Sequence, residues 1–281
     1  LEEGTRGRRD GVVESLLCTI TGAEAATVVN NNAAATLLVL AALCAGKDCI
    51  VSRGQLIEIG GSFRLPDVIA QSGARMVEVG TTNKTHLRDY VNAMTEDTHA
   101  ILRVNPSNYR IIGFSKSVPV AELVALKEGR EIVVIDDLGC GALVDLSQFG
   151  LPKEPTAQES VKAGADVTLF SGDKLIGGPQ SGIIIGGKVF IDIIRKHPLA
   201  RALRVGKFTI AALEATLRLF LEPETLPKRH PIIRMISRTY GELKQQAETL
   251  QKRLSPLIDC EVIEGESACG GGSLPDAILQ T

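Results

Sequence analysis

At about 100–200 residues per domain, the 281 residues of this chain make one large domain or two unequal ones, and 44% hydrophobic residues exclude a disordered protein. Lys and Arg number 31 against 33 Asp and Glu, so the net charge of −2 excludes a basic nucleic-acid-binding module, and 4% aromatic residues without Trp argue against a base-stacking platform. The longest apolar run, 33–45, is shorter than the ~20 residues of a membrane-spanning helix, so no membrane contact is predicted.

Short apolar runs alternate with longer helical segments along the first two thirds of the chain. The predicted strands are 26–30, 49–52, 76–79, 100–104, 132–135, 167–170 and 183–186, and the predicted helices between them include 32–45, 63–72 and 120–127. Runs this apolar, without strict alternation of apolar and polar residues, are typical of strands buried on both faces of a mostly parallel sheet. The pattern therefore predicts an α/β fold with helices on both faces and an active site at the carboxyl ends of the strands.

The end of the chain, from about residue 211, has a different character. A helix is predicted over 211–221, and Pro223, Pro227 and Pro231 then mark a boundary. A long, charged, amphipathic helix is predicted over 232–254. We therefore expect a large domain at 1–222 and, at 223–281, a linker with a smaller, incomplete α+β domain. Because the chain begins without Met, at Leu1, we also expect it to be a fragment.

The cysteines and histidines favour neither a zinc site nor a disulfide framework. No two of the six cysteines have the CxxC spacing, and no two of the four histidines are spaced as metal ligands. We expect reduced thiols in a cytoplasmic protein that binds no metal. For Cys140, which lies close to an acidic pair, we expect a buried structural thiol.

Lys174 follows the predicted strand 167–170 in the segment SGDKLIGGPQ, which runs from Ser171 to Gln180. A phosphate-binding P-loop is excluded, because its lysine follows the glycines and opens a helix, whereas here Lys174 precedes them and Pro179 blocks a helix. Two interpretations remain for Lys174: a solvated loop lysine, or a lysine that forms a Schiff base and is held by Ser171 and a tight turn.

Three asparagines join a strand to an alanine-rich helix at 30–32. Asparagine caps helices well, and the free N–H groups of a first helical turn attract anions. A plain cap is one interpretation. The other is a phosphate bound at Asn31, Asn32 and Ala33, which three consecutive polar residues favour.

Asp136 and Asp137 end the predicted strand 132–135. A buried carboxylate requires a cation or several hydrogen-bond donors. One interpretation turns both acids to solvent; in the other, one of them faces a protonated pyridine nitrogen and keeps that ring electron-withdrawing. A lysine, an anion-binding helix start and a strand-end aspartate on one sheet together describe a site for pyridoxal 5′-phosphate (PLP). Asn108 is then either a turn residue or a donor to the phenolic oxygen of PLP.

A basic cluster occupies 195–207 and contains no acidic residue. Arg201 and Arg204 are three residues apart, so they share a face if the segment is helical. The cluster is either a solvated basic surface or a site for an oxyanion or phosphate. Arg6, Arg8 and Arg9 form a possible second basic patch.

Beyond these motifs, the chain resembles the bacterial selenocysteine synthases, the L-seryl-tRNA(Sec) selenium transferases. The resemblance rests on LCTITGAEA at 17–25, VVNNNAAA at 28–35, SRGQLIEIGGSFR at 52–64, SNYRIIGF at 107–114 and the segments 2–9, 79–86, 137–147, 171–185 and 197–221. Gln55 departs from the glutamate expected after Ser-Arg-Gly. The family also has an N-terminal tRNA-binding domain and a further active-site arginine, which would both precede Leu1.

The resemblance implies a fold-type-I PLP-dependent transferase that converts seryl-tRNA(Sec) to selenocysteinyl-tRNA(Sec) through an aminoacrylate intermediate. Lys174 would be the Schiff-base lysine, Asp137 would face the pyridine nitrogen, and Asp173 would assist proton transfer or make a structural hydrogen bond. Arg201 and Arg204 would bind selenophosphate, the selenium donor. The resemblance also implies a homodimer or larger homo-oligomer with a shared active site.

Two alternatives of other kinds remain at the level of sequence. A PLP-dependent lyase of the same fold would act on a small phosphorylated amino acid or amino sugar, and its arginines would bind the substrate phosphate. A nucleotide-binding Rossmann-like protein is less favoured, because no GxGxxG motif follows the first predicted strand.

Overall fold

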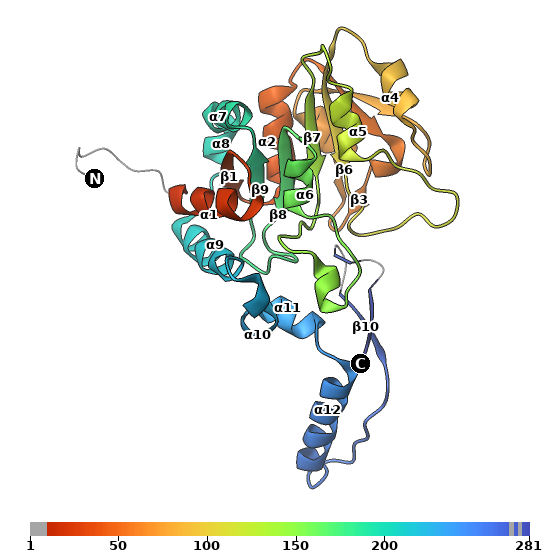
Figure 1. Cartoon of the computed structure of the whole chain (residues 1–281), viewed down its shortest axis with the longest axis vertical. Coiled ribbons are helices and arrows are strands. Elements are labelled where there is room, and N and C mark those ends of the chain that lie inside the picture. Colours follow the sequence, from red (N-terminus) through yellow and green to blue (C-terminus); the bar gives the residue numbers. More distant parts are fainter. Residues whose placement is uncertain (1–9, 270–272, 275–276) are drawn as a thin grey trace, which may run out of the picture.

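The computed structural model describes residues 10–269, 273–274 and 277–281 (Figure 1). Its centre is a seven-stranded sheet in the order β1-β9-β8-β7-β6-β2-β5. The strands are β1 (Ala25–Val29), β2 (Asp48–Ser52), β5 (Arg75–Val79), β6 (Thr98–Val104), β7 (Val133–Asp137), β8 (Val167–Ser171) and β9 (Gly182–Gly186). All seven predicted strands are confirmed, with ends that move by one or two residues.

The sheet is mostly parallel, as predicted. The pairs of β2 with β5 and β6, of β6 with β7, and of β7 with β8 are parallel. β9 runs antiparallel to both of its neighbours, β1 and β8. Every residue of β1, β7, β8 and β9 is buried, which explains why these strands lack an alternating polar pattern.

Helices cover both faces of the sheet (Figure 1). They are α1 (Gly11–Thr21), α2 (Asn32–Leu43), α3 (Leu65–Gln71), α4 (Leu87–Ala93), α5 (Val120–Ala125), α6 (Ala157–Lys162), α7 (Lys188–Lys196), α8 (Pro198–Ala202) and α9 (Lys207–Leu219). Successive residues of a strand point to opposite faces. In β9, Ile183 and Ile185 accordingly pack in the cluster with α1 and α9, while Ile184 packs in the cluster with α2 and α7.

Short elements fill the connections. They are the strands β3 (Glu58–Ile59) and β4 (Phe63–Arg64), which form a hairpin, and the 3-10 turns η1 (Arg53–Gln55) and η2 (Leu146–Phe149). The helix predicted over 63–72 therefore starts later, at Leu65, because Phe63 and Arg64 pair with the strand before them.

The C-terminal part begins with η3 (Pro223–Thr225), α10 (Leu226–Arg229), α11 (Pro231–Ile236) and α12 (Tyr240–Leu254), and ends with the hairpin of β10 (Glu266–Ala268) and β11 (Ile278–Gln280). The single helix predicted over 232–254 is wrong. Thr239 starts α12 with a capping box, in which its side chain accepts from the Glu242 amide and the Glu242 side chain accepts from the Thr239 amide. α12 extends away from the sheet, while Leu226 and Ile233 bury their side chains beside α9 (Figure 1).

Within the described ranges, no helix combines the length and apolar character needed to cross a membrane.

Candidate active site

Asp137 is the last residue of β7, and its carboxylate is buried among three hydrogen-bond donors. Asn32 Nδ2 (2.8 Å) and the Gly139 amide (2.9 Å) donate to Oδ1, and the Thr36 hydroxyl donates to Oδ2 (3.1 Å). Burial raises the pKa of Asp137, and the three donors only partly offset this effect. No lysine or arginine in the described part of the chain pairs with it, so the site is suited to a cation from outside the chain.

Asp136, one residue earlier, has a different role. Arg103 Nη1 lies 2.6 Å from its Oδ1, and the Ser160 hydroxyl donates to Oδ2 at 2.7 Å. Asp136 is thus a buried ion-pair partner inside the fold. The interpretation in which both acids face solvent is wrong, because both side chains are at most 5% exposed.

The turn after β7 is tightly packed and carries the site. Gly139 has φ +67°, and a Cβ at this position would lie 2.6 Å from Ser107 Oγ. Only glycine fits such a left-handed, crowded position. The Gly139 carbonyl also accepts a hydrogen bond from the Ser171 amide (2.9 Å), which joins the end of β7 to the end of β8.

The side chains of the two asparagines at the start of α2 make different contacts. Asn31 is the N-cap and accepts from the Ala34 amide at 2.8 Å, whereas the Asn32 side chain reaches across to Asp137. Asn32 Oδ1 is buried and has no hydrogen-bond partner among the residues that the structure describes. The sequence prediction placed Asn31, Asn32 and Ala33 together on a phosphate; the side-chain contacts assign the first to the cap and the second to the aspartate.

Lys174 lies in a closed turn after β8. The Gly177 amide donates to the Lys174 carbonyl, and the Gly178 amide donates to the Gly172 carbonyl, both at 2.9 Å. The Lys174 side chain is half-buried, and its charge lowers the pKa of the Cys140 thiol, which burial raises to about 12. Lys174 is therefore near the turn that carries Asp137, and Cys140 is the buried thiol that we expected.

The other predicted residues on this side occupy distinct environments. Ser171 is buried at the end of β8, whereas Asp173 is exposed beside Lys174. Asn108 follows β6, and its Oδ1 is buried with no hydrogen-bond partner in the described part of the chain. Gln55, the departure from the family pattern, is buried and accepts from the Val104 amide at 3.1 Å, which satisfies the last amide of β6.

Arg201 and Arg204 line one cavity of about 580 Å³ between β1, α7 and α8. α8 ends at Ala202, so the two arginines do not share a helical face as predicted; instead, Arg204 pairs through its backbone with Val29 at the end of β1. Asp10, Asp192 and Arg195 also line the cavity. Lys174 and Asp137 are not among the residues that line it. Arg6, Arg8 and Arg9 lie outside the described residues.

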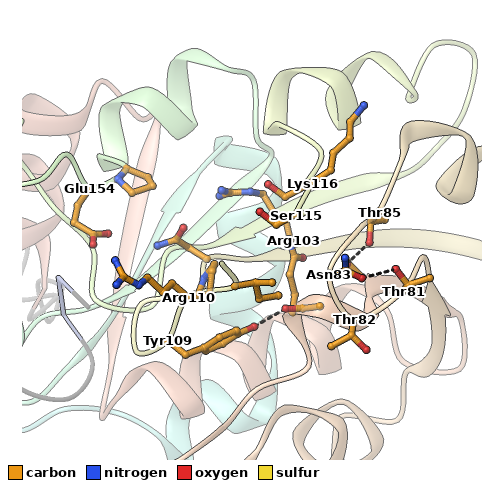
Figure 2. Close-up of a pocket in the computed structure, with 18 of the residues that line it drawn as sticks. Thr81, Thr82, Asn83, Thr85, Arg103, Tyr109, Arg110, Ser115, Lys116 and Glu154 are labelled. Carbon is orange, nitrogen blue, oxygen red and sulfur yellow. Dashed lines mark hydrogen bonds between the residues drawn. The ribbon is translucent and has the colours of Figure 1, made fainter. Parts of the chain in front are cut away.

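A second polar cavity, of about 350 Å³, opens at the carboxyl ends of β2, β5 and β6 (Figure 2). Tyr109 crosses it to donate to the Gly54 carbonyl, and Thr81 and Asn83 lie on the loop after β5. Sequence reasoning did not predict this cavity, because its lining residues come from four separate connections that share no motif.

Solved structures show which class of fold this is. D-Glucosaminate-6-phosphate ammonia-lyase superposes with a TM-score of 0.63 and 22% identity, over 84% of this chain and 66% of that one. A cystathione gamma lyase from Micromonospora echinospora gives 0.56 and 22%, over 74% and 52%. At this identity the likeness concerns the fold alone, which is the mostly parallel α/β fold predicted from the sequence.

Comparison of sequences is more specific. The family model described as L-seryl-tRNA selenium transferase matches residues 1–281, and the chain belongs to this family. Curated proteins named L-seryl-tRNA(Sec) selenium transferase are 54% identical in Nitratidesulfovibrio vulgaris and 52% in Clostridium perfringens, each over 100% of this chain, and 51% over 98% of it in Haemophilus influenzae. The chain spans 60–62% of the length of these relatives. The resemblance inferred from the motifs is confirmed.

Proposed function

We propose that this chain is the catalytic core of a PLP-dependent L-seryl-tRNA(Sec) selenium transferase, which converts seryl-tRNA(Sec) to selenocysteinyl-tRNA(Sec) with selenophosphate as the selenium donor. The observation that carries the proposal is the identity of 51–54% to three enzymes of that name along nearly the whole chain. The buried carboxylate of Asp137 and the turn that holds Lys174 support it independently.

The residues at the end of β7 fit PLP. Asp137 is a buried carboxylate without a cationic partner in the described chain, and a protonated pyridine nitrogen supplies that cation. Asn108 carries a buried amide oxygen to which no described residue donates a hydrogen bond. Exchanging the two amide atoms by a flip would place a donor there, as a contact to the phenolic oxygen requires. The first turn of α2, with Asn31, Asn32 and Ala33, remains the proposed place for the phosphate through its backbone amides.

The chain's own groups then have defined tasks. When bound, PLP supplies an electron sink for the negative charge that develops at Cα of the seryl group. Lys174 holds the cofactor and, once released, removes the α-proton as a general base. Asp137 keeps the pyridine nitrogen protonated, Ser171 supports the turn beside the lysine, and Asp173, exposed beside Lys174, assists proton transfer.

The donor site is proposed at Arg201 and Arg204, whose guanidinium groups suit the oxyanions of selenophosphate. We also propose a homodimer or larger homo-oligomer with a shared active site, as the resemblance to the family implies. We place the enzyme in the cytoplasm, since all six cysteines are free thiols.

The test is to follow the visible absorbance of the PLP-loaded protein while candidate substrates are added. Seryl-tRNA(Sec) should change the spectrum, and small phosphorylated amino acids or amino sugars should not. The reverse pattern would establish a lyase of the same fold. In the selenium-transfer reaction, Arg201→Ala and Arg204→Ala should raise the KM for selenophosphate by roughly tenfold or more, because each removes a charge-assisted hydrogen bond. Arg218→Ala, an exposed arginine of α9 paired with Glu214, should leave it unchanged.

A further inference from the structure

His230 is a completely buried histidine that touches the turn containing Lys174. Its Nε2 lies 2.8 Å from the Ile176 carbonyl oxygen. Ile176 is itself 0% exposed, and among the described residues only His230 contacts its carbonyl oxygen by a hydrogen bond. A buried carbonyl that loses its donor is destabilised, so this contact fixes the position of the turn.

The second ring nitrogen of His230 is also occupied. His230 is the N-cap of α11, and its Nδ1 accepts from the Ile233 amide at 3.2 Å. Because Nδ1 is an acceptor, the proton is on Nε2, which donates to Ile176. Burial lowers the pKa of His230, so the ring stays neutral at physiological pH. It also packs edge-on against Phe220, with centroids 5.1 Å apart.

Gly177 brings the turn into direct contact with this ring. Its φ is +67°, and a Cβ there would lie 2.8 Å from His230 Cε1. Gly177 also closes the turn, because its amide donates to the Lys174 carbonyl. The imidazole therefore holds the turn at two adjacent residues, Ile176 and Gly177, two and three positions after the lysine.

We propose that His230 is a positioning residue for Lys174: by holding the Ile176 carbonyl and packing on Gly177, it fixes the turn that aims the lysine and couples the start of α11 to the active site. The inference rests on the proposed function only in taking Lys174 as the reactive lysine. An apolar residue would fill the same space, but it would make neither of the two backbone hydrogen bonds.

Two substitutions separate the two hydrogen bonds. In His230→Asn, the side-chain oxygen replaces Nδ1 and keeps the α11 cap, because asparagine is a good N-cap, but no donor reaches Ile176. In His230→Gln, the amide nitrogen takes the place of Nε2 and can donate to Ile176, while the cap is lost. Both variants lose the ring packing against Phe220, so they are matched in that respect.

The first readout is hydrogen exchange of the Gly177 amide in the protein without cofactor. We expect exchange to be roughly tenfold faster in His230→Asn, as the loss of a buried hydrogen bond implies, and within about threefold of wild type in His230→Gln. The second readout is the pH profile with which added PLP and borohydride label Lys174. The profile should shift in His230→Asn and return to that of wild type in His230→Gln.

Equal exchange and equal pH profiles in the two variants, or larger effects in His230→Gln, would overturn the proposal and leave His230 as a helix cap. Thermal unfolding of both variants shows whether either loses the fold; if His230→Asn unfolds, the rescue by His230→Gln is still decided by the exchange of its Gly177 amide. Failure of the proposed function is a separate result: PLP would not label Lys174 in the wild-type protein, whereas the exchange readout would be unaffected.

Discussion

Asp136 and Asp137 are adjacent in sequence and both buried, but their side chains have different partners. Their side chains leave β7 on opposite faces of the sheet, because successive strand residues alternate. Asp136 therefore meets Arg103 and Ser160, while Asp137 meets Asn32, Thr36 and the Gly139 amide. Within the described ranges, Asp136 pairs with an arginine and Asp137 pairs with neither a lysine nor an arginine. The difference assigns Asp136 to the fold and Asp137 to the proposed cofactor.

This contrast predicts opposite effects of two conservative substitutions. Asp136→Asn leaves Arg103 buried without its counter-ion and should lower the free energy of unfolding by about 3 kcal/mol. Asp137→Asn should make the protein without cofactor more stable at pH 7, because it removes a buried carboxylate. Denaturant unfolding measures both, and a destabilised Asp137→Asn protein at pH 7 would contradict this account.

Asp137 should also make the free energy of unfolding depend on pH, in a direction that follows from its raised pKa. Burial raises the pKa of Asp137 above its ordinary value of 3.8, so its protonated form is favoured in the folded state. Its contribution to stability is fully present below pH 3.8 and is lost as the pH rises through the raised pKa. The advantage of Asp137→Asn should therefore grow between pH 4 and pH 7, and PLP should reverse the order of stability by supplying the cation.

The residue types in the motifs predicted which residues belong to the site, but only the fold shows which contacts each of them makes. The motif NNN predicted an anion site and could not distinguish the cap, Asn31, from Asn32, whose partner Asp137 is 105 positions away. His230 gave no signal in the sequence, because its partner Ile176 belongs to a separate segment of the chain. Such long-range contacts leave no local pattern.

At the scale of elements, the strands were predictable and the helix ends were less so. A continuous apolar run such as 183–185 can be recognised without tertiary information, since both faces of its strand are buried. The break between α11 and α12 was missed because the periodicity of apolar residues continues across it. The signal that marks it is the capping box of Thr239 and Glu242.

This cap predicts a local effect on stability. Thr239→Ala removes the acceptor for the Glu242 amide and should destabilise α12 by about 1 kcal/mol, measured by hydrogen exchange of its first turn. Thr249→Ala is the matched control, because Thr249 lies inside α12 and its hydroxyl donates to the Gln245 carbonyl of the preceding turn. Alanine should be tolerated or favoured there. Equal losses in both variants would mean that Thr239 does not cap the helix.

At the scale of the whole molecule, the order of the strands determines where the proposed active-site residues lie. β7 and β8 are adjacent, so Asp137 and the turn with Lys174 meet at the same edge of the sheet. Arg201 and Arg204 reach a separate cavity beside the end of β1. The sequence predicted both groups, but where they lie in the fold depends on the order of strands, which no motif contains.

The most direct test of the central claim is to add PLP to the purified protein, reduce it with borohydride and map the labelled peptide. We predict a single label at Lys174, no label at the exposed control Lys188, and loss of the label in Lys174→Ala. A label at another lysine, or equal labelling of the Lys174→Ala protein, would contradict the assignment of this turn as the cofactor site.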